Sequence, residues 1–135
     1  MGYTNALKLA GAEIHAFKRF GTYQGDWYAK VTYNGITGFI QGSFGSCSMC
    51  DAFEHEFESV MHTHENGDNI FGGLYEDEIF DTNCNECQET QKRLKSFGER
   101  YLDNILTKEE AIAKASENIA WDLDAQDLVN WLKEN

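Results

Sequence analysis

The feature that most constrains the fold of this chain is its set of four cysteines, which come as two CxxC pairs. Cys47-Ser-Met-Cys50 and Cys84-Asn-Glu-Cys87 hold all the cysteines of the 135 residues, and 33 residues separate Cys50 from Cys84. Two such pairs joined by a long loop are typical of a tetrahedral zinc site, in which each pair holds one side of the metal. The sequence therefore predicts that Cys47, Cys50, Cys84 and Cys87 bind one structural Zn²⁺ and join the two halves of the chain.

A redox function is the alternative interpretation of the same cysteines. A CxxC that follows a strand and begins a helix is typical of thioredoxin-like dithiol proteins. Those proteins place a cis-proline beside the disulfide, and this chain contains no proline. We expect Cys50 and Cys87 to lie at helix N-termini, where backbone amides stabilise thiolates in a metal site as well as in a redox site.

Length and composition predict one domain that spans residues 1–135. Nine Phe, six Tyr and three Trp provide enough apolar surface for a core, so a disordered chain is not expected. The first ten residues lack the apolar run of a signal peptide, and no stretch approaches the roughly 18 apolar residues of a membrane span. We therefore expect a cytoplasmic protein, a location in which paired cysteines act as metal ligands or redox groups more often than as structural disulfides.

The net charge of −12 is concentrated in one part of the chain. Residues 51–91 hold twelve Asp and Glu and no Lys or Arg, whereas residues 1–50 hold four basic residues against two acids. So acidic a surface repels phosphate backbones, which argues against direct nucleic-acid binding and favours a basic protein partner. The acids that we expect to contact this partner are Asp51, Glu54, Glu58, Glu65, Glu76, Asp77, Glu78 and Asp81.

The first half of the chain is predicted to form a small antiparallel sheet. Residues 27–33 alternate between apolar and polar side chains, the pattern of a half-buried strand. Asn34-Gly35 follows and is the strongest short hairpin signal, because both residues tolerate a positive φ. The return strand is expected over residues 36–41, a third strand over residues 14–20 and a short helix over residues 4–10. The Gly- and Ser-rich residues 42–50 are expected to form a loop.

The second half of the chain is predicted to be helical. A helix is expected to begin near Asp51 and to end at Asn66-Gly67. Another helix follows Cys87, and its buried stripe is Leu94, Phe97, Tyr101 and Ile105. Thr107 and Glu110 form a capping box, and Asp124 is expected to cap a last helix that buries Leu128, Val129, Trp131 and Leu132. The predicted fold class is α+β, with the sheet followed by three to four helices.

One face of the helix expected after Asp51 offers a second candidate site. His55, Glu58 and His62 recur at helical spacing, so a metal with nitrogen and oxygen ligands fits this face. A metal-dependent hydrolase built on these residues is therefore an enzymatic alternative. Solvated histidines and glutamates on an exposed helix face are the simpler interpretation of the same pattern.

One segment resembles a known group of viral proteins. Residues 42–54, GSFGSCSMCDAFE, together with residues 23–27, YQGDW, resemble a segment of small uncharacterised proteins of tailed bacteriophages. The resemblance covers residues 20–57, and glycine is common in that group where Met49 stands here. It implies a phage-encoded accessory protein that acts in the bacterial host cytoplasm by binding a host component, and it implies no catalytic residues.

These observations together predict a non-enzymatic, zinc-stabilised acidic protein that binds and modulates a basic host protein. One version of this hypothesis is a DNA mimic, in which carboxylates occupy the DNA-binding surface of a host nucleic-acid enzyme. The alternative is a small enzyme, either a dithiol oxidoreductase or a metal-dependent hydrolase.

Overall fold

A computed structural model gives the arrangement of the chain. It describes residues 2–21, 25–45, 51–57, 62–63, 69–70, 83–117 and 125–135. The elements are α1 (Tyr3–Leu9), β1 (Glu13–Gly21), β2 (Gly25–Tyr33), β3 (Ile36–Phe44), α2 (Ala52–Phe57), β4 (His62–Thr63), β5 (Asn69–Ile70), α3 (Asn85–Leu102), α4 (Lys108–Ser116) and α5 (Ala125–Glu134). The α+β class, with an antiparallel sheet before most of the helices, is confirmed.

Three strands form the main sheet in the order β1-β2-β3, and both pairings are antiparallel. The turn between β2 and β3 is the predicted hairpin, with Asn34 at φ +51° and Gly35 at φ +80°. Both values are those that a two-residue type I′ hairpin turn requires. Tyr33 pairs with Ile36 beside this turn, and the pairing continues as far as Gly25 with Phe44. The strand β3 therefore extends to Phe44, three residues beyond its predicted end.

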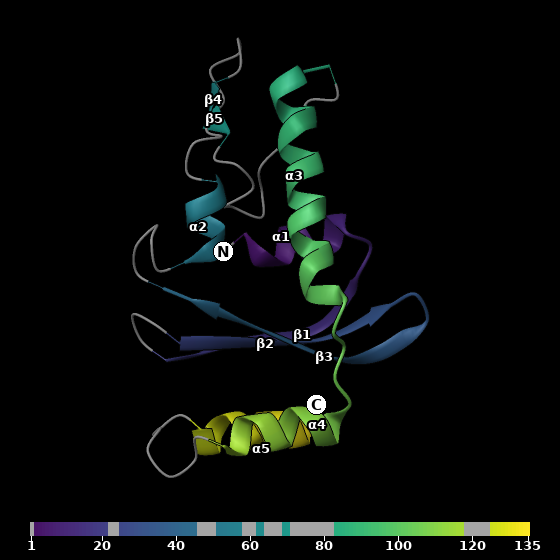
Figure 1. Cartoon of the computed structure of the whole chain (residues 1–135), viewed down its shortest axis with the longest axis vertical. Coiled ribbons are helices and arrows are strands. Elements are labelled where there is room, and N and C mark those ends of the chain that lie inside the picture. The colour runs from purple at the N-terminus through teal and green to yellow at the C-terminus, as the bar shows by residue number, and fades with distance from the viewer. Residues whose placement is uncertain are drawn as a thin grey trace.

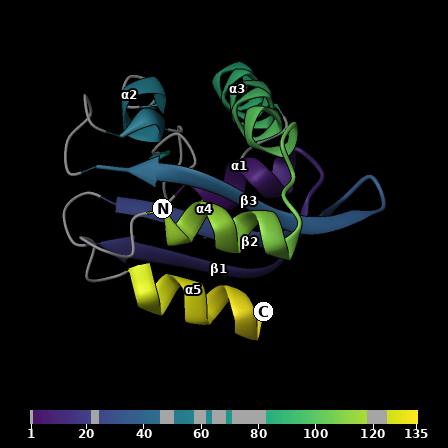
Figure 2. The same cartoon turned by 60° about the horizontal axis from the view of Figure 1, so that its bottom comes forward.

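Helices cover both faces of this sheet (Figures 1 and 2). Along β2, Trp27, Ala29 and Val31 face the core beneath α1 and α3, and Tyr28 faces a second core beneath α4 and α5. Tyr28 is therefore buried, and the prediction of a strand buried on only one face is wrong. The prediction failed because Lys30 and Thr32 gave this face a polar character, although helices cover both faces of the sheet and Tyr28 is buried there.

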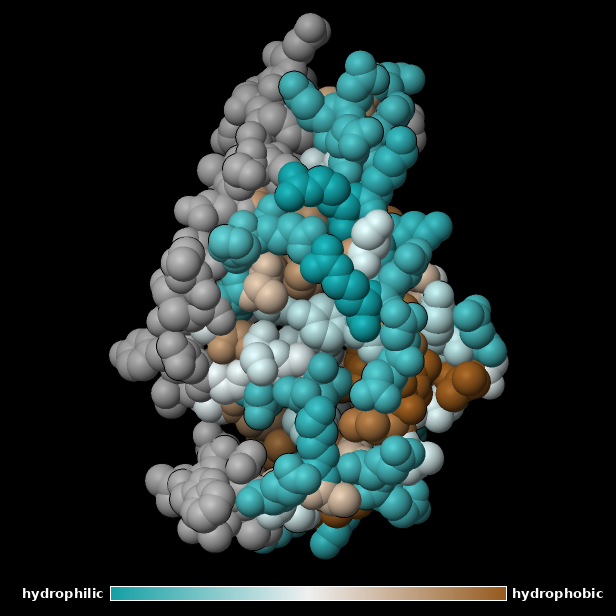
Figure 3. Space-filling model, in the orientation of Figure 1, coloured by the Kyte–Doolittle hydropathy of each residue, from teal (hydrophilic) through white to brown (hydrophobic). Residues whose placement is uncertain are grey.

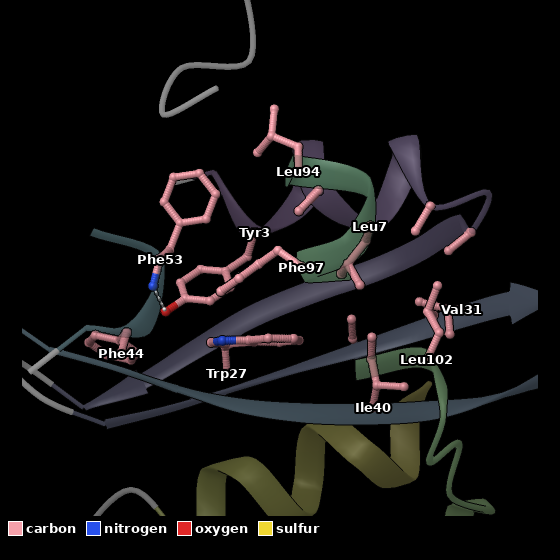
Figure 4. Close-up of a cluster of buried hydrophobic side chains, with 14 of the residues drawn as sticks. Tyr3, Leu7, Trp27, Val31, Ile40, Phe44, Phe53, Leu94, Phe97 and Leu102 are labelled. Carbon is pink, nitrogen blue, oxygen red and sulfur yellow. Dashed lines mark hydrogen bonds between the residues drawn. The ribbon is translucent and has the colours of Figure 1, made fainter. Parts of the chain in front are cut away.

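The larger core is aromatic and is centred on Trp27 (Figure 4). The ring of Trp27 lies 5.2 Å from that of Tyr3, 5.3 Å from that of Phe17 and 5.0 Å from that of Tyr101, measured between centroids. Gly42 on β3 gives the indole its space, because a Cβ at this position would lie 2.3 Å from an indole carbon. A glycine that the sequence assigns to a loop therefore lies inside a strand, where it admits a large ring.

The chain passes from one layer of helices to the other beside β3. Phe39 and Leu106 exchange two backbone hydrogen bonds, with N···O distances of 2.8 and 2.7 Å. Helix α3 ends at Leu102, so Ile105 lies beyond the helix, next to Leu106. The buried helix stripe predicted from the sequence therefore lacks its last member. The predicted capping box then begins α4: the Thr107 hydroxyl accepts from the amide of Glu110, and the Glu110 carboxylate accepts from the amide of Thr107. In the last helix, Leu128, Val129 and Leu132 are buried as predicted, and Trp131 is partly buried.

Candidate functional site

The second CxxC pair occupies the first turn of α3. Cys84 is the N-cap residue, and its sulfur accepts a hydrogen bond from the amide of Cys87 at 3.4 Å. Cys84 is partly exposed and Cys87 is fully buried. The prediction that Cys87 lies at a helix N-terminus is confirmed. An amide that donates to a cysteine sulfur stabilises a thiolate, so the donor set at this end of α3 is chemically suited to a thiophilic metal ion.

The first CxxC pair, Cys47 and Cys50, lies outside the described residues, whereas Gly45 and Asp51 on either side of it are described. Gly45 and Asp51 bound the segment 46–50, and the amide of Gly45 donates to Asp51 Oδ2 at 3.1 Å. This hydrogen bond therefore joins the end of β3 to the start of α2.

Asp51 is a buried structural carboxylate with 1% of its surface exposed. Its Oδ1 accepts from the Tyr3 hydroxyl at 2.7 Å and from the amide of Phe53 at 3.0 Å, which caps α2. The Tyr3 hydroxyl also lies 3.1 Å from the carbonyl oxygen of Ser43 at the end of β3. The prediction that Asp51 belongs to an exposed acidic face is wrong, because its carboxylate joins α1, α2 and the end of β3.

The same contacts perturb Tyr3. Burial, followed by the hydrogen bond to Asp51, holds the pKa of Tyr3 far above its usual range. The hydroxyl therefore stays protonated and acts as a permanent donor to the carboxylate. Figure 4 shows the Tyr3 hydroxyl beside the amide nitrogen of Phe53 and above the Trp27 ring. The Tyr3 hydroxyl and the Asp51 carboxylate are buried and hydrogen-bonded to each other, which is typical of a structural site.

Helix α2 is fixed against the middle of α3. Phe53 and Phe57 are buried, and each ring lies 5.5 Å from the ring of Phe97. The carboxylate of Glu56 accepts two hydrogen bonds of 3.1 Å from Arg100, while its carbonyl oxygen accepts one of 2.8 Å from Arg93. A bidentate pair of this kind neutralises Glu56 and orients α2.

The described residues beside the two cysteine pairs lie at different levels of α3. Phe53 and Tyr3, which hold Asp51, both contact Phe97, and Phe97 is the thirteenth residue after Cys84. Because an α-helix rises about 1.5 Å per residue, Phe97 lies roughly 20 Å along the axis from Cys84. Figure 1 shows the same arrangement, with α2 beginning far below the upper end of α3.

The predicted histidine face is not formed. His55 is exposed on α2, but His62 lies in β4, which pairs with β5 through His62 and Ile70. A helix that began near Asp51 and continued to Asn66 would include His62, so that prediction is wrong, and His55, Glu58 and His62 do not share a helix face. The sequence pattern misled because Phe53, Phe57, Val60 and Met61 keep a helical period up to the residue before β4.

Most of the predicted partner-binding acids lie outside the described residues. These are Glu58, Glu65, Glu76, Asp77, Glu78 and Asp81, together with the side chain of Glu54. Glu86 and Glu89, near the start of α3, are exposed, and Glu89 lies 3.7 Å from Lys92 in a solvated pair. Figure 3 shows mainly hydrophilic residues over this end of the molecule. Such surface pairs contribute little stability, so Glu86 and Glu89 remain accessible to a charged partner.

Sequence reasoning missed Tyr3 and Gly45, which complete the Asp51 cluster. An Asp before a helical run is a helix N-cap signal, so the hydrogen bond from the Phe53 amide to Asp51 could have been predicted from the sequence. The hydrogen bond from Tyr3 could not be predicted, because Tyr3 and Asp51 lie 48 positions apart and only the tertiary fold brings them together.

No protein family, curated protein or solved structure matches this chain. Within the described part of the chain, no three side chains of His, Cys, Asp or Glu gather in a metal-binding arrangement. The described helices include none whose length and hydropathy would let it cross a membrane.

Proposed function

We propose that this protein is a non-enzymatic interaction protein that binds a basic protein partner through its acidic segment, residues 51–91. The observation that carries the proposal is the complete lack of Lys and Arg in this segment of twelve acids. A segment without Lys or Arg has no basic side chains of its own to neutralise its carboxylates. Its charge is therefore available to a partner wherever the rest of the fold does not neutralise it.

The contacts of α2 limit how much of that charge the fold uses. Among the described acids of the segment, Asp51 is buried and hydrogen-bonded, and Glu56 forms an ion pair with Arg100. Glu86 is exposed at the start of α3. The candidate partner-binding residues are therefore Glu86 and the predicted acids other than Asp51, namely Glu54, Glu58, Glu65, Glu76, Asp77, Glu78 and Asp81.

The proposal includes zinc bound by the cysteines as a stabilising ion. Cys84 and Cys87 would hold it at the start of α3, and Cys47 and Cys50 would hold it beside Asp51. Zinc bound by thiolates contributes its binding free energy to folding, because the unfolded chain has no preformed site. A zinc with all its positions filled by the protein would be structural rather than catalytic.

The resemblance to small phage proteins favours a bacterial host protein as the partner. The DNA-mimic version of the proposal gives that partner a surface that normally binds DNA, which the carboxylates of residues 51–91 would occupy in place of phosphates. The enzymatic alternative that retains a described site is a dithiol oxidoreductase, because Cys84 and Cys87 share one helix turn.

A binding experiment with a matched charge control tests this proposal. The immobilised chain is incubated with bacterial lysate, the retained proteins are identified, and their affinity is measured with purified protein at about 50 and 300 mM salt. One variant neutralises Glu76, Asp77 and Glu78 as Gln, Asn and Gln. The control neutralises the same number of exposed acids on α4 and α5, namely Glu109, Asp127 and Glu134.

We expect a basic partner whose affinity falls by roughly tenfold or more at the higher salt concentration. The variant in residues 76–78 should weaken binding severalfold, and the control should leave it nearly unchanged. Duplex DNA should compete with the chain if the partner surface is a DNA-binding site. Equal losses in both variants, or affinity independent of salt, would contradict a specific role for the acidic segment.

A further inference from the structure

The two edges of the main sheet differ in how the fold uses them. Strand β3 lies at one edge, where Phe39 exchanges two backbone hydrogen bonds with Leu106 and the carbonyl oxygen of Ser43 accepts from the hydroxyl of Tyr3. Strand β1 lies at the other edge (Figure 2). Among the described strands, only β2 pairs with β1. The fold therefore covers part of the β3 edge and leaves the β1 edge open to a further strand.

The strand registers show which backbone groups of β1 point outward. Along a strand, the N–H and C=O groups of successive residues point alternately to one side and to the other. Phe39 bonds away from β2, so its partner Lys30 directs its own groups toward β1, where it pairs with Ala16. The groups of Phe17 and Arg19 therefore point outward, and no contact in the described part of the chain occupies them.

The exposed side chains in the middle of this edge are basic. Lys18 and Arg19 are both exposed, and neither forms an ion pair within the residues that the structure describes. The one acid of β1, Glu13, lies beyond a bulge at which the register with β2 shifts. Because a bulge interrupts regular pairing, the usable edge is the segment 16–20, which carries two cations and no carboxylate.

Lys18 and Arg19 lie on opposite faces of the strand. Lys18 shares a face with Phe20, and its Nζ lies 5.7 Å from the centroid of that ring, in the core beneath α4 and α5. The guanidinium carbon of Arg19 lies 4.4 Å from the centroid of the Phe44 ring, which belongs to the core beneath α1 and α3. Successive residues of an added strand also alternate between the two faces. Two consecutive acids in such a strand would therefore place one carboxylate beside each cation.

We propose that the outer edge of β1, residues 16–20, accepts an extended acidic segment of a partner protein as an additional strand of the sheet. Hydrogen bonds to the backbone of Phe17 and Arg19 hold the segment, and its two consecutive acids pair with Lys18 and Arg19. A second copy of this chain fits less well, because antiparallel pairing of residues 16–20 with themselves brings the cations of both copies together. This site is separate from residues 51–91, so the proposal goes beyond the proposed function.

Binding of a defined peptide tests the charge requirement. The probe is the labelled peptide Thr-Val-Asp-Glu-Val-Thr with both ends blocked, and its neutral counterpart is Thr-Val-Asn-Gln-Val-Thr. Fluorescence polarisation at about 50 mM salt measures both peptides with the wild type and with Lys18→Gln/Arg19→Gln. The control Lys95→Gln/Lys114→Gln removes two exposed cations from α3 and α4.

We expect the wild type and the control to bind the acidic peptide roughly fivefold or more tightly than the neutral one, since two cross-strand ion pairs are added. The Lys18→Gln/Arg19→Gln protein should bind both peptides with similar affinity. Equal affinity for the two peptides in the wild type, or an unchanged preference in this variant, would overturn the proposal. A single-stranded oligothymidylate that binds the wild type more tightly than the acidic peptide would assign the edge to nucleic acid instead.

Amide hydrogen exchange tests whether the peptide adds as a strand. In the free protein, the amides of Phe17 and Arg19 should exchange at least about tenfold faster than that of Lys18, which points toward β2. Saturating acidic peptide should slow the exchange of Phe17 and Arg19 by about tenfold or more. Amides of Phe17 and Arg19 as protected as that of Lys18 in the free protein would show that the edge is already occupied. That result, or peptide binding without added protection, would refute the strand addition.

Discussion

Replacing Tyr3 with phenylalanine isolates the contribution of one buried hydroxyl. The ring of Tyr3 is 1% exposed and contacts Trp27, Phe53, Phe97 and Tyr101, and phenylalanine keeps all these contacts. Only the hydroxyl is lost. With it go the 2.7 Å bond to the Asp51 carboxylate, the 3.1 Å bond to the Ser43 carbonyl oxygen and the 3.4 Å bond that the hydroxyl accepts from the Phe53 amide. A hydrogen bond to a charged group stabilises a protein by about 1.5–3 kcal/mol, and Asp51 is left buried with fewer donors. We therefore expect the free energy of unfolding to fall by about 2–3 kcal/mol.

Urea denaturation, followed by far-UV circular dichroism with a chelator present, measures this loss at constant metal occupancy. For a chain of this length, each 1 kcal/mol corresponds to about 4 °C in Tm, so a thermal scan should show a decrease of roughly 8–12 °C. Tyr101→Phe is the matched control, because Tyr101 lies in the same aromatic cluster and is only partly buried. Its loss should stay within about 0.5 kcal/mol.

Two results would refute the reasoning. A Tyr3→Phe protein as stable as the wild type would show that the bond to Asp51 contributes nothing beyond the hydration it replaces. Equal losses for Tyr3→Phe and Tyr101→Phe would show that any change in the aromatic cluster lowers the stability, whatever the hydroxyl binds. A third variant, Asp51→Asn, keeps the size of the side chain and removes its charge, so it should lower the stability by at least as much as Tyr3→Phe.

Two further predictions concern the packing of α1 and the ionisation of a buried tyrosine. Gly98→Ala should lower the free energy of unfolding by about 1–3 kcal/mol, because the new Cβ would lie 2.2 Å from the carbonyl oxygen of Ala6. This loss should exceed the gain from the better helix propensity of alanine. Urea denaturation measures the change, with the exposed Ser96→Ala as the control. Burial, with the charges of Asp26 and Glu117, raises the pKa of Tyr28 to about 12. The unfolded chain therefore loses the phenol proton of Tyr28 near pH 10, while the folded chain keeps it. The free energy of unfolding should fall between about pH 10 and 12, and it should fall less steeply in Tyr28→Phe. The midpoints of urea denaturation at about pH 9 and pH 11 measure this difference.

Local signals in the sequence were sufficient for the hairpin and for the helix ends. Asn34-Gly35 and the Thr107–Glu110 capping box each depend on residues within four positions of one another, so the backbone geometry follows from the residues themselves. The single-domain interpretation stays a prediction. The end of β3 was predicted too early, because Gly42 and Ser43 suit a loop in isolation. Their place in the strand depends on Trp27, whose ring requires a neighbour without a side chain.

The candidate site was harder to predict because its decisive contacts join distant parts of the chain. Asp51 has the sequence context of an exposed acid near the start of an amphipathic helix. Its burial depends on bonds from Tyr3 and Gly45, which no local pattern indicates. Similarly, the two CxxC pairs have the spacing of one metal site. Cys47 and Cys50 lie outside the described residues, so the four-cysteine site stays a prediction.

The packing of α2 also decides how the acidic segment is presented. Arg93 and Arg100 lie just beyond the segment in sequence, and both are bound to Glu56. These two cations therefore hold α2 in place, and Lys92 pairs with Glu89 near the start of α3 on the solvated surface. A double variant, Arg93→Gln/Arg100→Gln, would release α2 while making the net charge more negative by two. If the acidic segment binds its partner through charge alone, this variant should bind more tightly. If the partner requires the segment in a fixed position, it should bind more weakly, and the direction of the change separates these two modes of recognition.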